Sequence, residues 1–347
     1  MNNNSERCAH IIYTPFTGVG LHGGFRGDEW FTHRINIFKR FTLKSLLNQS
    51  NRDFIHWTSF RPEERNHPYV RELAQYLADL NYPFVFTFNG LMYWDDKFNS
   101  YGIKEMARNF LMMLWDCWNY KDWKGLKNVL KYTWENKNNT LYRRVSESLS
   151  IMVDSLGKDY DWIYLTRIDS DDMFHKEAVN LIQSEPPSYK KALIFKEGYI
   201  LNVQTGQVAE WNPPTNPPFH TIIFPGNIFF NPERYLEYYG DFKSHEDVAR
   251  IFDCTVLDMK KYCISFHGKH ISTAWDSPII KKVYYKMKYG SSEPFKGVEY
   301  EPKGYCYTTS GRNISTFWES RISKQKNFMI GGEYTADSGL EILKDFG

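Results

Sequence analysis

The chain has 347 residues, of which 42% are hydrophobic, 17% aromatic and 24% charged. This composition supplies enough apolar material for a large core and excludes extensive disorder. Because 43 basic side chains face 41 acidic ones, the formal net charge is only +2 and gives no reason to expect a nucleic-acid partner. The length fits one large α/β domain with an appendage.

The first 90 residues alternate between strand and helix patterns. β-branched and aromatic side chains predict strands at residues 10–16, 54–60 and 84–88. Apolar positions with helical spacing predict helices at residues 32–47 and 69–80. This alternation is typical of a parallel sheet covered by helices.

The next segment, residues 89–139, interrupts the alternation. It is rich in Trp and Tyr, has a helical pattern and resembles an insertion into the domain. A helix is then expected at residues 140–156. The near-continuous β-prone run at residues 162–168 predicts a central strand that is buried on both faces.

The patterns continue less regularly toward the carboxyl terminus. Two more strands are expected at residues 192–203 and 220–230, and a helix at residues 244–252. The Pro-Gly turn at residues 224–228 is either an ordinary turn or a segment that faces a substrate. We therefore expect a catalytic domain at residues 1–275 and a C-terminal extension at residues 276–347.

The compartment can also be predicted. The 5 cysteines are widely spaced and form no CxxC pair, which favours a reducing environment over a disulfide framework or a zinc site. The first ten residues are polar and lack the apolar stretch of a secretory signal, and no apolar run is long enough to span a membrane. We expect a cytoplasmic protein.

Three aspartates, Asp169, Asp171 and Asp172, directly follow the expected central strand. Ligands of open α/β sheets bind beyond the carboxyl ends of the strands, so these carboxylates lie where a ligand is expected. Their mutual repulsion favours a hard cation, Mn²⁺ or Mg²⁺, that would bridge to a diphosphate. The alternative is that Asp169 and Asp171 belong to an ordinary loop. For Asp172 we favour the cap of a helix that begins near Phe174.

Two motifs resemble glycosyltransferase family 2. The segment SLLNQS at residues 45–50, followed by Asp53 and a strand, is similar to the SLLNQ segment of that family. The stretch WIYLTRIDSDDMFHKEAVNLI resembles the family's strand, DxDD motif and helix, and TRIDSDD is closer still to a bacterial group of rhamnosyltransferase-like proteins. The similarity covers roughly residues 11–270 and is weak outside these motifs. It implies a GT-A (Rossmann-like) fold, with a mixed, mainly parallel sheet flanked by helices.

The resemblance implies roles for four acidic residues. In that family the first Asp of DxD contacts the nucleotide ribose and the last holds the metal, which implies Asp169 for the nucleotide, with the metal held by Asp171 and Asp169. The Asp of a later ED pair activates the acceptor, and Glu246-Asp247 matches this pair. Asp247 would take the proton that the acceptor hydroxyl loses. A capping box that starts at Ser244 is the alternative for this pair.

Several basic side chains are candidates for the diphosphate. His267 and His270 follow a β-prone run, and a histidine here resembles the late metal or diphosphate contact of many GT-A enzymes. Which of the two makes that contact stays open, and so does a structural role for both. Lys269, Arg144 and Arg167 can offer positive charge to the departing diphosphate. Arg167 lies within the strand, so a buried pair with a nearby carboxylate is its alternative.

The nucleobase region departs from the family pattern. Family 2 usually has acidic residues after the second strand, whereas this chain has TSFRP at residues 58–62. Thr14, Pro15 and Arg61 lie at the expected strand ends, in the region of the nucleotide, and Phe60 is placed to stack on a base.

These inferences predict a metal-dependent inverting glycosyltransferase. It would move a hexosyl or deoxyhexosyl group from a nucleotide-sugar donor to a hydroxyl of a glycan or other acceptor. A nucleotidyltransferase on a similar sheet ranks lower, because the glycine-rich loop at residues 18–27 has only Arg26 as a positive charge. A non-catalytic carbohydrate-binding module is the third reading. The interleaved lysines and tyrosines at residues 281–289 suggest either peripheral membrane contact or a solvated helix face.

Overall fold

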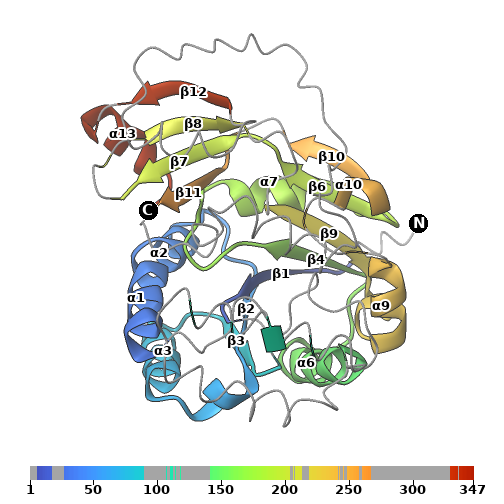
Figure 1. Ribbon diagram of the computed structural model, residues 1–347. Helices are drawn as coiled ribbons and strands as arrows, with labels where there is room; N and C mark the ends of the chain where they lie inside the picture. Colours follow the sequence, from blue (N-terminus) through green and yellow to red (C-terminus); the bar gives the residue numbers. More distant parts are fainter. Residues whose placement is uncertain are drawn as a thin grey trace.

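The computed structural model describes residues 6–17, 27–89, 141–203, 208–212, 219–240, 248–257, 260–266, 329–334 and 336–347, with single positions at 107, 110, 111, 114, 118, 206, 242 and 245. In these residues the chain forms two sheets, which lie one above the other in Figure 1. Most of the predicted insertion and most of the predicted C-terminal extension lie outside the described residues.

The first sheet has seven strands in the order β10-β6-β9-β4-β1-β2-β3. Their bounds are β1 Cys8–Pro15, β2 Ile55–Ser59, β3 Phe84–Thr87, β4 Trp162–Arg167, β6 Lys191–Phe195, β9 His220–Pro225 and β10 Asp253–Leu257. All neighbours are parallel except the pairs that β9 makes with β4 and β6. The predicted mixed, mainly parallel, Rossmann-like sheet is therefore confirmed.

Helices cover both faces of this sheet (Figure 1). One face is covered by α1 (Gly27–Arg40), α2 (Thr42–Leu47), α3 (Pro68–Asp79) and α7 (Ala178–Ser184), and η2 (Pro62–Asn66) precedes α3. The other face is covered by α6 (Leu141–Leu156), α8 (Gly226–Phe229), α9 (Pro232–Tyr239) and α10 (Val248–Ile251).

Alternating side chains of the central strands fill these two cores. Ile12 of β1 shares one buried cluster with Phe38 and Leu73 of α1 and α3. Its neighbour Ile11 shares the opposite cluster with Leu149 of α6. Because successive residues of a strand point to opposite faces, a strand covered on both faces must be apolar throughout. This explains the near-continuous β-prone runs at β1 and β4.

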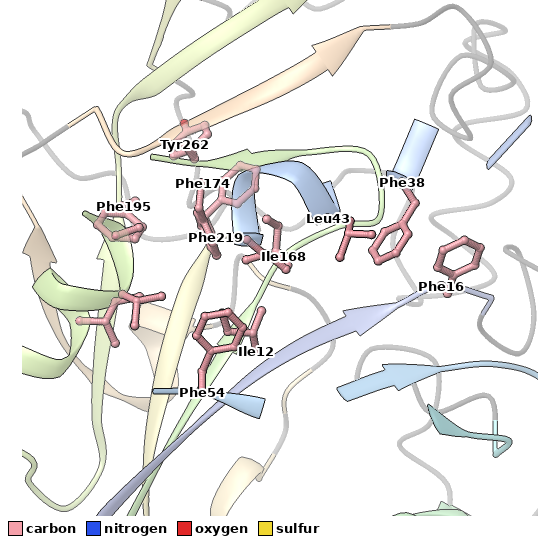
Figure 2. Packing of buried hydrophobic residues seen from close by; sticks show 14 of the residues in the cluster. Ile12, Phe16, Phe38, Leu43, Phe54, Ile168, Phe174, Phe195, Phe219 and Tyr262 are labelled. Atoms are coloured by element: carbon pink, nitrogen blue, oxygen red, sulfur yellow. The ribbon is translucent and has the colours of Figure 1, made fainter. Parts of the chain in front are cut away.

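The second sheet is built from strands that are distant in sequence, in the order β12-β8-β7-β11-β5. Their bounds are β5 Met173–Phe174, β7 Gly198–Asn202, β8 Val208–Asn212, β11 Tyr262–Phe266 and β12 Met329–Tyr334, and helix α13 (Ala336–Leu343) follows. Aromatic rings join the two sheets, as Figure 2 shows for Phe174, Phe219 and Tyr262. The rings of Phe219 and Tyr262 stack with centroids 4.0 Å apart.

The predicted single helix at residues 32–47 is wrong. Helix α1 begins earlier, at Gly27, and ends at Arg40, and α2 begins at Thr42. The break lies at Phe41, whose side chain packs with Ile37 in the core of the second sheet, whereas Leu43 packs in the core of the first. Both helices pack on the first sheet, and the break between them lies where Ile37 and Phe41 turn toward the core of the second.

The predicted strand at residues 192–203 is two strands, β6 and β7, that belong to different sheets. The chain crosses between the sheets just before Gly198. A Cβ atom at Gly198 would lie 2.5 Å from the ring of Tyr262, so only glycine fits this crossing. Continuous β propensity does not show where such a crossing occurs.

Two further boundaries differ from the prediction. The strand expected at residues 220–230 ends at Pro225, and α8 follows at once. Pro225 pairs with Trp162 at the start of β4, whereas the aspartates follow the end of β4. The turn therefore lies at the opposite end of the strands from the aspartates. It therefore does not face the predicted site. Of the helix expected at residues 244–252, the described part is α10.

Within the described residues, no helix is both long and apolar enough to cross a membrane. Part of the predicted C-terminal extension joins the second sheet, because β12 pairs with β8. The segment after α13 returns to the first helices: Phe346 is buried in one cluster with Ile37 and Met173.

Candidate functional site

The order of the strands locates a candidate site. On one side of β1 the sheet continues to β2 and β3, and on the other side to β4, so the chain changes direction between β1 and β4. Open α/β sheets bind ligands at such a switch point, beyond the carboxyl ends of the strands. The backbone N–H of Ile168 donates to the carbonyl oxygen of Tyr13 at 3.0 Å, so the segments that leave β4 and β1 start side by side.

The segment that leaves β4 is the acid loop, defined as Asp169, Ser170, Asp171 and Asp172. Buried apolar residues anchor it at both ends, Ile168 before it and Met173 and Phe174 after it. Figure 2 shows Ile168 and Phe174 within the same packed cluster. The loop is therefore held in place by the core and not by its charged residues alone.

Asp169 is paired with the strand that precedes it. Arg167 Nε and Nη2 donate to Asp169 Oδ1 at 3.0 Å and 2.7 Å. The Arg167 side chain is buried, whereas that of Asp169 remains 31% exposed. The alternative reading of Arg167, as a buried partner of a nearby carboxylate, matches this geometry, and Asp169 keeps an oxygen within reach of solvent.

Asp171 is paired with Arg34, a residue that sequence reasoning missed. Arg34 Nη1 donates to Asp171 Oδ2 at 2.6 Å, and Arg34 Nε donates to Ser170 Oγ at 2.8 Å. The side chains of Arg34 and Asp171 are 9% and 7% exposed. A signal was present in the sequence, because Arg34 lies between Phe31, Ile35 and Phe38 on the apolar face of its helix, where a charged side chain is unusual.

Asp172 is not a helix cap, which corrects the prediction. The residues after it form β5, and the next helix, α7, begins only at Ala178. The carboxylate is buried, and its Oδ1 accepts a hydrogen bond from the backbone N–H of Ser265 in β11 at 3.2 Å. Burial raises the pKa of Asp172 well above its ordinary value, and the charges of Asp171 and Asp169 add to this effect.

The SLLNQ segment contacts the chain that follows the acid loop. Ser45 Oγ accepts from the backbone N–H of Phe174 at 3.1 Å. Gln49 Nε2 donates to the carbonyl oxygen of His175 at 2.9 Å, and its Oε1 accepts from the N–H of Val179 at 3.1 Å. The SLLNQ segment therefore fixes the chain that leaves the acid loop, which gives a physical reason for finding both motifs in one sequence.

The ends of β1 and β2, where nucleotide contacts were predicted, are closed by their own side chains. Thr14 and Pro15 are buried, and Thr14 Oγ1 forms a 2.9 Å hydrogen bond with His56 Nε2. Arg61 is also fully buried, and its backbone N–H donates to Thr17 Oγ1 and Glu64 Oε2.

Phe60, predicted as a platform for a base, is fully buried. Its ring packs against those of Phe16, Phe86 and Phe88, with centroids 4.9 Å to 5.9 Å away. It is part of the core and offers no free face to a base, so this prediction is wrong. A strand-end position predicted the region correctly but not the exposure of the ring.

Arg144 lies in α6, which covers the face of the first sheet opposite to α1 and α3. It is buried in α6, and its carbonyl oxygen accepts from Asn89 Nδ2 at 3.3 Å. The remaining predicted site residues, Glu246, Asp247, His267, Lys269 and His270, lie outside the described residues. Phe266, the last residue of β11, directly precedes His267 in the chain.

Within the part of the chain that the structure describes, no group of three or more His, Cys, Asp and Glu side chains is arranged to hold a metal ion. The pairings above supply a reason. Arg167 holds Asp169, Arg34 holds Asp171 and the backbone of Ser265 holds Asp172. The three carboxylates are thus turned toward different partners.

Comparisons with known proteins add little to this description. No protein-family model matches the chain, and no curated protein matches it. Among solved structures it is similar to the crystal structure of residues 1–349 of TarS from S. aureus, with a TM-score of 0.33, 11% sequence identity and coverage of 83% of this chain and 67% of that one. A likeness at this level shows no function.

Proposed function

We propose that the chain is a metal-dependent inverting glycosyltransferase that uses a nucleotide-sugar donor and a glycan or other hydroxyl acceptor. One observation carries the proposal: the acid loop directly follows the central strand β4 at the switch point of the sheet, and Asp169 keeps a partly exposed carboxylate there. The contacts between the SLLNQ segment and the chain after the acid loop support it, because both motifs resemble the same family.

The acid loop would form the donor site, with Asp169 toward the nucleotide ribose and Asp171 and Asp169 toward Mn²⁺ or Mg²⁺. The donor chemistry fits, because carboxylate oxygens are the ligands that these hard cations take. Arg34 and Arg167 already pair with these two carboxylates, so a bound metal would have to share each carboxylate with an arginine. When bound, the metal would supply positive charge to the departing diphosphate.

The chain's own groups would do the rest of the chemistry. Asp247, with Glu246 beside it, would accept the proton of the acceptor hydroxyl as that oxygen attacks the anomeric carbon. His267, His270 and Lys269 would face the diphosphate or the metal. Support comes from β11, since Ser265 contacts both Asp171 and Asp172 and His267 follows two residues later in the sequence.

The roles of the remaining candidates are narrower. Arg167 would act mainly by holding Asp169, with which it is paired. The side chains of Thr14, Pro15 and Arg61 are buried, so their contact with the nucleotide stays a prediction. A role for Arg144 at the diphosphate and contact of residues 281–289 with a membrane surface stay predictions.

A panel of nucleotide sugars tests the proposal. A ligand that binds only the native state raises its apparent stability, so the true donor should raise the melting temperature in the presence of Mn²⁺. Rhamnosyl and other deoxyhexosyl donors come first, because TRIDSDD resembles rhamnosyltransferase-like proteins. The proposal fails if no nucleotide sugar stabilises the protein with Mn²⁺, or if free sugars stabilise it equally well without nucleotide or metal.

A further inference from the structure

Arg34 connects helix α1 to the acid loop through two hydrogen bonds. Its guanidinium donates to Ser170 from Nε and to Asp171 from Nη1, so both residues are held by one planar group. Such a two-point contact fixes the direction of the guanidinium and of the carboxylate together. Asp171 Oδ2 therefore points toward α1.

The ion pair between Arg34 and Asp171 is withdrawn from solvent. The side chains of Arg34 and Asp171 are both nearly buried, so water screens their attraction poorly. Asp169 differs, because its partner Arg167 leaves it 31% exposed. Both carboxylates proposed for the metal are therefore paired with an arginine, but only that of Asp169 keeps a part of its surface exposed to an incoming cation.

We propose that Arg34 competes with the divalent metal for Asp171 and thereby lowers the metal affinity of the site. This inference rests on the proposed function only in taking the acid loop as a metal site. A metal that binds Asp171 Oδ2 must displace the guanidinium or bind beside a positive charge, and either event weakens binding. Removal of the charge of Arg34 should therefore strengthen metal binding, whereas removal of a residue that merely builds the site should weaken it.

Mn²⁺ alone is the probe, and the free ion is measured by electron paramagnetic resonance, so no donor or acceptor is needed. Arg34→Gln should bind Mn²⁺ at least about tenfold more tightly than the wild type, a difference of about 1.4 kcal/mol. Arg40→Gln is the matched control, because Arg40 is an exposed arginine of the same helix. It should change the affinity less than about twofold, since an exposed charge is screened.

Two more variants keep the test decisive if Arg34→Gln folds poorly. Arg34→Lys keeps the charge but loses the fork that reaches Ser170, so its affinity should lie between those of the wild type and Arg34→Gln. The double variant Arg34→Gln with Asp171→Asn removes both charges of the pair and should lose the gain. Circular dichroism reports whether each variant is folded.

The proposal is overturned if folded Arg34→Gln, or Arg34→Lys in its place, binds Mn²⁺ no more tightly than the wild type. It is also overturned if the double variant keeps the gain, because the metal then does not use Asp171. If no variant binds Mn²⁺, the competition is excluded, while sugar transfer from a nucleotide sugar without metal remains a separate measurement. Failure of the two proposals is therefore distinguishable.

Discussion

The two halves of the switch point are built differently. At the end of β4, the acid loop reaches out to α1 through Arg34 and to β11 through Ser265, and Asp169 stays partly exposed. At the ends of β1 and β2, Thr14 and Arg61 are fully buried among their own neighbours. A place at a strand end therefore predicts which residues lie near a ligand, but partners and burial decide which side chains can touch it.

The largest expected effect is on the acid-loop half. Asp171→Asn keeps the size of the side chain but removes the charge needed for a metal, so turnover of the nucleotide sugar should fall by at least about a hundredfold. Asp154→Asn, on the exposed face of α6, should leave turnover unchanged. Steady-state kinetics measures both, and full activity in Asp171→Asn would remove the acid loop from the chemistry.

A second test asks how firmly the acid loop is supported. Phe346 is buried beside Met173, which directly follows the loop, and the neighbouring Asp345 pairs with Lys176 at 2.7 Å. Phe346→Ala should lower the free energy of unfolding by about 3 kcal/mol, because it leaves a cavity. Leu340→Ala, in the same segment but 58% exposed, should cost little. Equal effects in urea titrations would show that Phe346 is not part of the core.

Acid should lower the stability of the strands β1 and β2, at whose ends nucleotide contacts were predicted. Burial lowers the pKa of His56, which bonds to Thr14, to about 3, and does the same for His10. The unfolded chain binds these protons near pH 6.5 and the folded chain does not, so stability is lost as pH falls from about 6.5 toward 3. Between pH 7 and pH 5, each of the two histidines should lower the free energy of unfolding by about 2 kcal/mol.

Urea titrations at these two pH values measure the loss. His56→Gln should remove about half of the part due to the two histidines, because glutamine does not titrate. A His56→Gln variant with the same pH dependence as the wild type would mean that His56 is protonated in the folded state. The buried network at the ends of β1 and β2 would then be more open than described.

The smallest effect separates structure from binding at Thr14. Thr14→Val removes the hydrogen bond to His56 and should cost about 1 kcal/mol of unfolding free energy. It should change the affinity for the nucleotide sugar less than about twofold, because the hydroxyl is buried. A tenfold loss of affinity without a loss of stability would instead place the side chain in the nucleotide site.

Much of the first sheet could be predicted from sequence. Strands β1, β2, β3 and β4 and helices α3 and α6 differ from the predicted ranges by only one or two residues at an end. Their patterns are local, because each strand is apolar or β-branched throughout and each helix has one apolar face. The same reasoning placed Asp169 and Asp171 beyond a central strand.

The second sheet and the partners of the acid loop could not be predicted in this way. Strand β12 pairs with β8 across more than a hundred residues, and β5 has only two residues, so neither leaves a local pattern. Because β5 has only two residues, it was not recognised as a strand, and Asp172 was wrongly predicted to cap a helix at this place. Arg34 was missed because a helix pattern shows that a charged residue lies on an apolar face but not which carboxylate it meets.

Sugar transfer from a donor bound at the acid loop is the proposed reaction. Its most direct test is to incubate the protein with the stabilising nucleotide sugar and Mn²⁺ and to identify the phosphate-containing product, in the wild type and in Asp171→Asn. We expect the wild type to release nucleoside diphosphate and the variant to lose this release. Release of pyrophosphate, or equal release of nucleoside diphosphate by both proteins, would contradict it.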